Sequence, residues 1–342
     1  MTSLLADSKI DTSKVAEVAL SAAEVTGGSY RSGLSRHLMS EHAAVLCLSI
    51  LLVLGSPRNL RGSTGLGNAS RIQTEELRAD FAQVEAERQV QLGLQAGEKP
   101  ACDYHKALKY FQAAAAMGSA KGSYYIGFCY DHGLGVSQDD AQALKYYTEA
   151  ADKGYAAAQN SLGVMYGSGK GVPRDDVTAV QWYRMAAEQG DLNALNSLGG
   201  MYATGRGVPV NDAEAVKYFS RSAHGGFAQA QHNLGLRFYS GLGIARNDFE
   251  AARWFRAAAE QGFGPSQDVL GMLYKRGQGV PQDNVAAYVW RSLAARQGVD
   301  NIVARERLVL LMTEDQIVEA QSRVLSWKAN PTWKPVWGIP IM

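Results

Sequence analysis

The sequence contains few cysteines and no excess of charge of either sign. Its three cysteines, in 342 residues, are too few for a fold held together by disulfide bonds. The 34 lysines and arginines balance 33 aspartates and glutamates, which leaves a formal net charge of +1. Because so small a charge produces no overall field that attracts polyanions, we expect no nucleic-acid partner, and any recognition through charge must be local.

Long hydrophobic runs are also scarce. Residues 1–70 contain one apolar run, at 43–54, which is shorter than the about 20 residues that cross a bilayer. The run has the length of a signal-peptide core, with Arg31 and Arg36 upstream. The sequence therefore favours an exported or membrane-associated protein with a poorly ordered segment at 1–70. A cytoplasmic protein is the alternative, and a second possible start at Met39 leaves cleavage open.

Glycine, in contrast, is abundant and regularly spaced. Many of the 36 glycines recur at a constant step along the chain. Four registers repeat every 36 residues, namely those that run from Gly127 to Gly271, Gly133 to Gly277, Gly135 to Gly279 and Gly118 to Gly298. A fixed period of this length is typical of repeat architectures, in which each unit stacks on its neighbours.

Each unit predicts two helices. Ala143, Tyr147 and Ala150 have the spacing of one helical face, which indicates a first helix, named helix A. A second, helix B, follows a short turn at Gly154 and carries apolar residues such as Leu162. The short connection predicts that the two helices pack antiparallel.

Two further features of the unit have expected roles. The residues just before helix A are expected to cap it with a side-chain oxygen, namely Asp140, Asp176, Asp212, Asp248 and Asn284. Gly163 lies inside helix B, where glycine costs roughly 1 kcal/mol relative to alanine. Its return in five units predicts that two backbones approach there too closely for a Cβ atom.

The repeated motif is most complete between Asp176 and Asn211. It comprises Ala179, Trp182, Tyr183, Ala186, Ala187, Gly190, Leu198, Gly199, Met201, Tyr202, Gly205, Gly207, Val208 and Pro209. This pattern resembles the Sel-one-like repeat family, relatives of the tetratricopeptide repeats. The resemblance implies an all-α fold, a right-handed superhelical solenoid of antiparallel helix pairs, and a role as an adaptor or regulator that binds other proteins.

The expected organisation has five parts. They are a poorly ordered segment at 1–70, a capping helix and entry loop at 71–103, five repeats at 104–283, a half repeat with capping helices at 284–330, and a tail rich in proline and tryptophan at 331–342. Leu77, Phe81 and Val84 are expected to cover the first repeat, and Thr313 is expected to open the last helix. The tail is expected either to fold back on the C-terminal helices or to act as a docking segment.

Motifs for catalysis are absent from the sequence. No serine is followed three residues later by lysine, and there is no Gly-x-Ser-x-Gly elbow, zinc-protease helix or Walker loop. We therefore expect no catalytic residue and no cofactor. The cysteine-rich relatives with β-lactamase-like activity carry a cysteine pair in each repeat, whereas units two to five here contain none.

One cluster could nevertheless bind a metal. Cys102, His105, Cys129 and His132 form two Cys-x-x-His pairs near helix ends that the antiparallel arrangement brings together. Four such side chains match the donors of a structural zinc site. Ordinary packing and a Cys102–Cys129 disulfide in an exported chain remain alternatives at this stage.

A row of basic residues on helix A is the candidate binding surface. Lys109, Lys145, Lys217 and Arg253 share one register, which Gln181 interrupts, while Arg184 and Arg256 share a neighbouring register. Such a row could hold the carboxylates of an acidic peptide through charge-assisted hydrogen bonds. The alternative is a solvated helix face, partly neutralised by Glu149, Glu188 and Glu260. The row of Tyr146, Trp182, Tyr218, Trp254 and Trp290 is expected in the core.

The sequence thus predicts a non-catalytic, monomeric scaffold. We expect it to bind a protein or peptide segment, with an acidic segment as one candidate, on the concave face of the solenoid, in signalling, regulatory or envelope-associated complexes. An exported enzyme of β-lactamase type and a structural component of the envelope are the alternatives.

Overall fold

The computed structural model describes residues 67–98, 102–299 and 302–330. The chain divides into two units, Met1–Glu76 and Leu77–Met342. The described residues of the first unit belong to the start of one helix. The segments 1–66 and 331–342, which include the apolar run 43–54 and the tail, lie outside the described residues.

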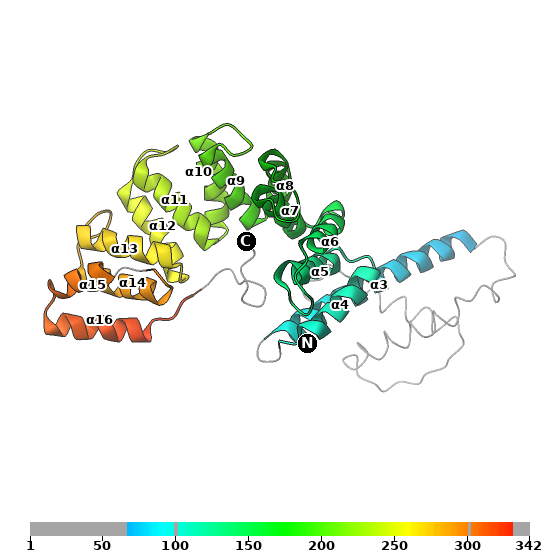
Figure 1. Cartoon of the computed structure of the whole chain (residues 1–342), viewed down its shortest axis with the longest axis horizontal. Coiled ribbons are helices and arrows are strands. Elements are labelled where there is room, and N and C mark those ends of the chain that lie inside the picture. The colour runs from blue at the N-terminus through cyan, green and yellow to red at the C-terminus, as the bar shows by residue number, and fades with distance from the viewer. Residues whose placement is uncertain (1–66, 99–101, 300–301, 331–342) are drawn as a thin grey trace. The chain divides into compact units, whose positions relative to one another are not determined.

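The described residues form α-helices and no strand, which confirms the expected all-α fold. The helices are α3 (Gly67–Gly97), α4 (Tyr104–Ala116), α5 (Ala120–His132), α6 (Asp140–Asp152), α7 (Ala156–Ser168), α8 (Asp176–Glu188), α9 (Leu192–Thr204), α10 (Asp212–His224), α11 (Ala228–Ser240), α12 (Asp248–Glu260), α13 (Gly264–Arg276), α14 (Asn284–Arg296), α15 (Ile302–Val309) and α16 (Glu314–Ser326). From α4 to α14 each helix packs against the next, as Figure 1 shows, so the repeats form a solenoid of helix pairs.

The caps of the A helices lie one residue earlier than the sequence predicted. The side chains that accept backbone N–H groups at these helix starts belong to Asp139, Asp175, Asn211, Asn247 and Asp283. The predicted caps, such as Asp176, are instead the first residues of the helices. The error arose because two capping-type residues stand side by side at most of these helix starts.

In the first four units the glycine inside helix B faces a ring of the following A helix, whereas in the fifth a Cβ on Gly271 would lie 2.7 Å from the Arg291 side chain and 2.9 Å from the backbone oxygen of Ala287. A Cβ atom on Gly163 would lie 2.5 Å from the ring of Tyr183, and one on Gly199 would lie 2.6 Å from the ring of Phe219. These rings belong to the following A helix and are almost fully buried. The predicted close approach is therefore real, but in the first four units an aromatic side chain fills the space that a Cβ would need.

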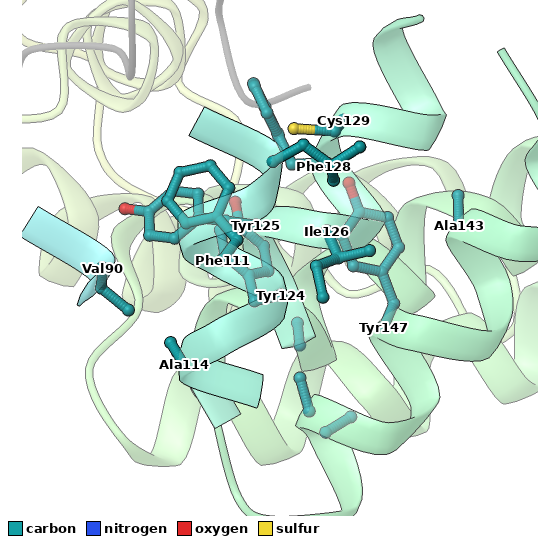
Figure 2. Close-up of a cluster of buried hydrophobic side chains, with 14 of the residues drawn as sticks. Val90, Phe111, Ala114, Tyr124, Tyr125, Ile126, Phe128, Cys129, Ala143 and Tyr147 are labelled. Carbon is teal, nitrogen blue, oxygen red and sulfur yellow. The ribbon is translucent and has the colours of Figure 1, made fainter. Parts of the chain in front are cut away.

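The first helices share a dense aromatic core. Figure 2 shows Phe111 of α4, Tyr124 and Tyr125 of α5, and Tyr147 of α6 gathered beside Val90 of α3. The rings of Phe111 and Tyr125 stack with their centroids 4.9 Å apart. Burial of such rings removes roughly 150–250 Å² each from water and holds neighbouring repeats together.

The helix α3 packs through a different face from the predicted one. Val84 is 41% exposed, whereas Ala86 and Val90 are buried. A Cβ on Gly93 would lie 2.4 Å from the ring of Phe111, so α3 lies close to α4 at this glycine. The prediction for Val84 was wrong because the spacing of Leu77, Phe81 and Val84 is also compatible with a partly solvated helix face.

The C-terminal end is covered by α15 and α16, which pack on α14 (Figure 1). Thr313 and Gln316 form the capping box that the sequence predicted at the start of α16. Ala320 and Val324 are buried against α14, while Leu325 is 77% exposed. The last repeat therefore packs on α15, which has eight residues, and on α16, which leaves its other face exposed.

Candidate partner-binding surface

The six basic residues of the candidate surface all lie on A helices and are exposed. Lys109 belongs to α4, Lys145 to α6, Arg184 to α8, Lys217 to α10, and Arg253 and Arg256 to α12. They are here called the basic ridge. Because they all lie on A helices in two neighbouring registers, they form a row of cations that runs along the stacked repeats, as the sequence spacing predicted.

Three cations of the basic ridge lie over the aromatic ring of the next residue. Lys145 Nζ lies 5.4 Å from the ring centre of Tyr146, and Lys217 Nζ lies 5.9 Å from that of Tyr218. The guanidinium carbon of Arg253 lies 5.0 Å from the ring of Trp254. Each contact attracts the cation to the electron-rich ring face and limits the motion of the side chain.

The ridge aromatics are less buried than the sequence predicted. Tyr146, Trp182, Tyr218 and Trp290 are half-buried, and Trp254 is 8% exposed. For the first four along the chain the fully packed ring is that of the next residue, as with Tyr147 and Phe255, whereas Trp290 is followed by Arg291. The helical stripe is wide enough to include both positions, and only the second points directly at the preceding helix B.

Tyrosines of helix B extend the basic ridge. Tyr202 stacks on Tyr218 with ring centroids 5.5 Å apart, and Arg184 donates a 2.9 Å hydrogen bond to the Tyr202 hydroxyl. Arg256 donates to the hydroxyl of Tyr274 and lies over its ring. Sequence spacing did not mark these tyrosines as binding residues, and their recurrence three residues before a loop glycine, Gly205 or Gly277, is the signal that could have found them.

Acidic neighbours neutralise part of the ridge, and the ion pairs involve glutamates that were not predicted. Glu214 lies 3.3 Å from Lys217, and Glu250 lies 3.0 Å from Arg253. Of the predicted glutamates, Glu149 binds Lys153, whose hydrogen bond is the main reason that the pKa of this carboxyl is lowered, and the charge of Lys145 lowers it further. Lys109 and Lys145 make no ion pair with any residue that the structure describes.

The cysteines and histidines do not assemble into a metal site. Cys129 lies in the aromatic core of Figure 2, where burial raises the pKa of its thiol to about 12. His132 stacks on Phe128, and His105 is exposed. Among residues 67–98, 102–299 and 302–330, no three His, Cys, Asp or Glu side chains are placed to hold a metal ion.

The predicted disulfide is also absent from the described chain. Cys102 and Cys129 both have free thiols. Cys129 occupies the register of Met165 and is buried as Met165 is, so it acts as a small apolar core residue. Of the three alternatives for this cluster, ordinary packing agrees with the structure.

The acidic residues at the starts of the A helices link successive repeats. Arg206 lies between two loop glycines and reaches back to Asp176, and this bond with a second one from Arg174 lowers the pKa of Asp176 to about 2. In the next repeat Leu242 takes the place of Arg206, and Arg237 of α11 binds Asp212 at 2.6 Å instead. The arginine that departs from the motif thus replaces a lost loop cation.

No helix within the described ranges is long and apolar enough to cross a membrane. Because the run at 43–54 lies outside those ranges, its predicted role in export or membrane association stays a prediction.

The model of the Sel1 repeat matches this chain six times. The matches cover residues 89–119, 120–155, 156–191, 192–227, 228–263 and 265–299. The chain belongs to the Sel1 repeat family. The first Sel1 repeat begins inside α3, so the end of that helix takes the part of helix B in a unit that the sequence analysis treated as a cap. Sel1 repeat proteins are typically helical scaffolds for protein interaction.

Two solved structures share this Sel1 repeat fold. A Sel1 repeat protein from Oxalobacter formigenes is 32% identical, with a TM-score of 0.59, and the match covers 71% of this chain and 96% of that one. The protective antigen c5321 of uropathogenic Escherichia coli is 34% identical, with a TM-score of 0.60. That match covers 73% of this chain and 56% of the antigen, so this chain spans little over half of its length.

A mammalian relative matches over a short stretch. DAP3-binding cell death enhancer 1 of Rattus norvegicus is 40% identical over 53 residues, which is 16% of this chain and 10% of that protein. The match is about the length of one repeat and a half, and it supports the repeat family alone.

Proposed function

We propose that the protein is a non-catalytic scaffold whose basic ridge binds an acidic, extended segment of a partner protein. The observation that carries this proposal is the recurrence of a cation held over an aromatic ring on α6, α10 and α12. Solvated lysines and arginines that serve only solubility do not need a repeated aromatic support. The membership of a family of interaction scaffolds supports the same role.

The geometry suits carboxylates spaced along a peptide. Exposed ammonium and guanidinium groups form short, charge-assisted hydrogen bonds with carboxylates, and arginine binds them in a bidentate manner. The half-buried rings beside them offer apolar contact for the peptide chain. Because the repeats pack rigidly and the cations are already held over rings, little conformational entropy is lost when a partner binds.

The glutamates of the ridge set the affinity. Glu214 and Glu250 each hold one ridge cation in the free protein, so a partner carboxylate must compete with them. Lys109 and Lys145 make no such ion pair within the described chain, and Glu149 acts on Lys145 only as a nearby charge. We therefore expect the acidic segment to bind most strongly at the α4 and α6 end of the ridge.

The remaining expectations extend this proposal. We propose that residues 71–330 fold as the scaffold in a monomer, and that residues 43–54 direct export or membrane attachment of the chain. Limited proteolysis followed by mass spectrometry checks the first of these. Fractionation of native cells, with a variant in which Val45 and Leu52 are replaced by aspartate, checks the second.

Selection of displayed peptides tests the proposed function. A random peptide library is panned against the wild-type chain and against a variant with Lys109, Lys145, Lys217 and Arg253 changed to glutamate. We expect acidic peptides from the wild type and a loss of that preference in the variant. Selection of the same peptides by both proteins would contradict the proposal.

A matched control removes the effect of net charge alone. Arg88, Arg276, Arg307 and Arg323 are equally exposed and lie outside the basic ridge, and their change to glutamate alters the net charge by the same amount. This control variant should select the same acidic peptides as the wild type. If it loses them too, long-range charge rather than the ridge attracts the peptide.

A further inference from the structure

A second polar site lies at the C-terminal end of the solenoid, away from the basic ridge. The helices α14, α15 and α16 line an open pocket of about 500 Å³. Tyr288, Ser292 and Arg296 of α14 line it together with Arg305 of α15 and Gln321 of α16. Val324 and Leu325 of α16 form its apolar wall.

The pocket contains a buried hydroxyl group without a partner. Ser292 is only 7% exposed, and its Oγ atom makes no hydrogen bond within the described chain. A buried hydroxyl that is left unpaired costs free energy, which a ligand with a hydrogen-bonding group would recover. Serines elsewhere in the helices, such as Ser168 and Ser240, bond to the carbonyl four residues earlier.

An arginine beside this serine is also unsatisfied. The Nε atom of Arg305 is buried without a hydrogen-bond partner, and Arg305 makes no ion pair with the residues that the structure describes. Arg296 donates a 2.7 Å hydrogen bond to the carbonyl oxygen of Val324, which fixes the side chain at the rim of the pocket and leaves further N–H groups. No acidic side chain is among the lining residues, so the two arginines give the pocket a positive charge.

From these observations we infer that the pocket binds a small organic oxyanion, with a carboxylate or phosphate group between Arg296, Arg305 and Ser292. Guanidinium groups recognise the planar or tetrahedral oxygens of such anions through paired hydrogen bonds. The hydrocarbon part of the ligand would lie on Val324 and Leu325. This site does not depend on the function proposed for the basic ridge, because it uses none of the ridge residues.

Three probes that each contain a chain of six carbons in total test the inference, namely hexanoate, hexyl phosphate and the neutral hexanamide. The readout is the rise in melting temperature of the full chain with ligand concentration, because a ligand that binds only the folded state stabilises it. We expect hexanoate or hexyl phosphate to stabilise the protein and hexanamide to have little effect. The more effective of the two anions identifies the ligand as a carboxylate or a phosphate.

Arg305→Gln and its neighbour Arg307→Gln form a matched pair of variants. Both remove one positive charge from α15, but Arg307 is exposed and does not line the pocket. We expect Arg305→Gln to weaken the apparent affinity for the anion about tenfold or more, and Arg307→Gln to leave it unchanged. Ser292→Ala should weaken it as well while the net charge stays the same.

Three results would overturn the inference. They are equal stabilisation by hexanamide and the anions, an equal response of Arg305→Gln and the wild type, and no response of the wild type to either anion. The first would make the pocket purely apolar, and the other two would show that Arg305 has no ligand of this class.

Discussion

The contact between α11 and α12 and the equivalent contact between α13 and α14, one repeat later, differ at two positions whose side chains touch. In the first contact, the ring of His232 on α11 lies against that of Phe255 on α12, with centroids 5.4 Å apart. One period later, Asp268 on α13 lies 3.5 Å from Arg291 on α14, as an ion pair. Both residues of the contact differ between the two repeats, so equivalent packing sites hold an aromatic contact in one repeat and a pair of opposite charges in the next.

The exposed position of the A helix changes in the same comparison. Where α12 presents Arg253 to solvent, α14 carries Val289, which is 5% exposed because α16 covers it. The row of basic residues therefore ends where the cap begins. The basic residues thus occur where the A helix is exposed to solvent, whereas the residue type at the buried ring position depends on the contact with the preceding helix B.

An arginine at position 255, which is equivalent to Arg291 one repeat later, should have the largest effect on stability. Phe255 is fully buried, and Phe255→Arg would place a charge there without a partner. We expect a loss of about 4 kcal/mol in the free energy of unfolding, measured by urea titration followed by circular dichroism.

The second half of the natural pair should repair part of this loss. Addition of His232→Asp to Phe255→Arg rebuilds the combination found at Asp268 and Arg291, so the double variant should be more stable than Phe255→Arg alone. A double variant that is less stable would contradict the idea that the two positions change as a unit.

A methyl group opposite the buried ring should have the next largest effect. In Gly199→Ala the added Cβ would lie 2.6 Å from the ring of Phe219, and we expect a destabilisation of about 1–3 kcal/mol. The adjacent Gly200 has open space at its Cβ position, so Gly200→Ala should stabilise by about 0.5–1 kcal/mol. Equal effects of the two changes in a urea titration would show that the ring does not explain the glycine.

Acidification should weaken the fourth repeat through His232. Its Nδ1 atom lies 2.9 Å from Ser266 Oγ, the rings of Phe255 and Phe263 flank it, and burial lowers its pKa to about 4. Because the unfolded chain binds the proton more readily, this contribution to stability is present above pH 6.5 and is lost as the pH falls towards 4.

The size of this acid effect is on the order of 2 kcal/mol. Urea titrations at pH 7 and pH 4.5 should show a smaller decrease in His232→Asn than in the wild type. An identical decrease in both proteins would show that groups other than His232 cause the acid sensitivity. Asp191 is not one of these groups, because burial raises its pKa and its effect on stability therefore has the opposite sign.

The smallest effect concerns the link between repeats. Arg237→Met restores the residue type of Met165 and Met201 but removes the bond to Asp212, and we expect a loss of about 1 kcal/mol. Leu242→Lys, which restores the loop cation, should recover most of it in the double variant. If Arg237→Met alone is neutral, the bond contributes nothing to stability.

Sequence spacing was sufficient for the helix pairs, the glycine turns and the row of basic residues, because these depend on local periodicity. It misplaced the caps by one residue where Asp175 and Asp176 are adjacent, since either can accept the N–H groups. It could not identify Tyr183 as the partner of Gly163, which depends on the packing of one repeat on the next. The unpaired Ser292 and Arg305 depend on how α15 folds over α14, which no repeat pattern encodes.

The binding affinity of an acidic peptide selected by the wild-type chain tests the central claim most directly. It is measured by fluorescence polarisation for the wild type, for the glutamate variant of Lys109, Lys145, Lys217 and Arg253, and for the control variant outside the ridge. The account predicts that only the ridge variant loses the peptide, and that added salt weakens wild-type binding. Equal affinity of the ridge variant and the wild type would contradict it.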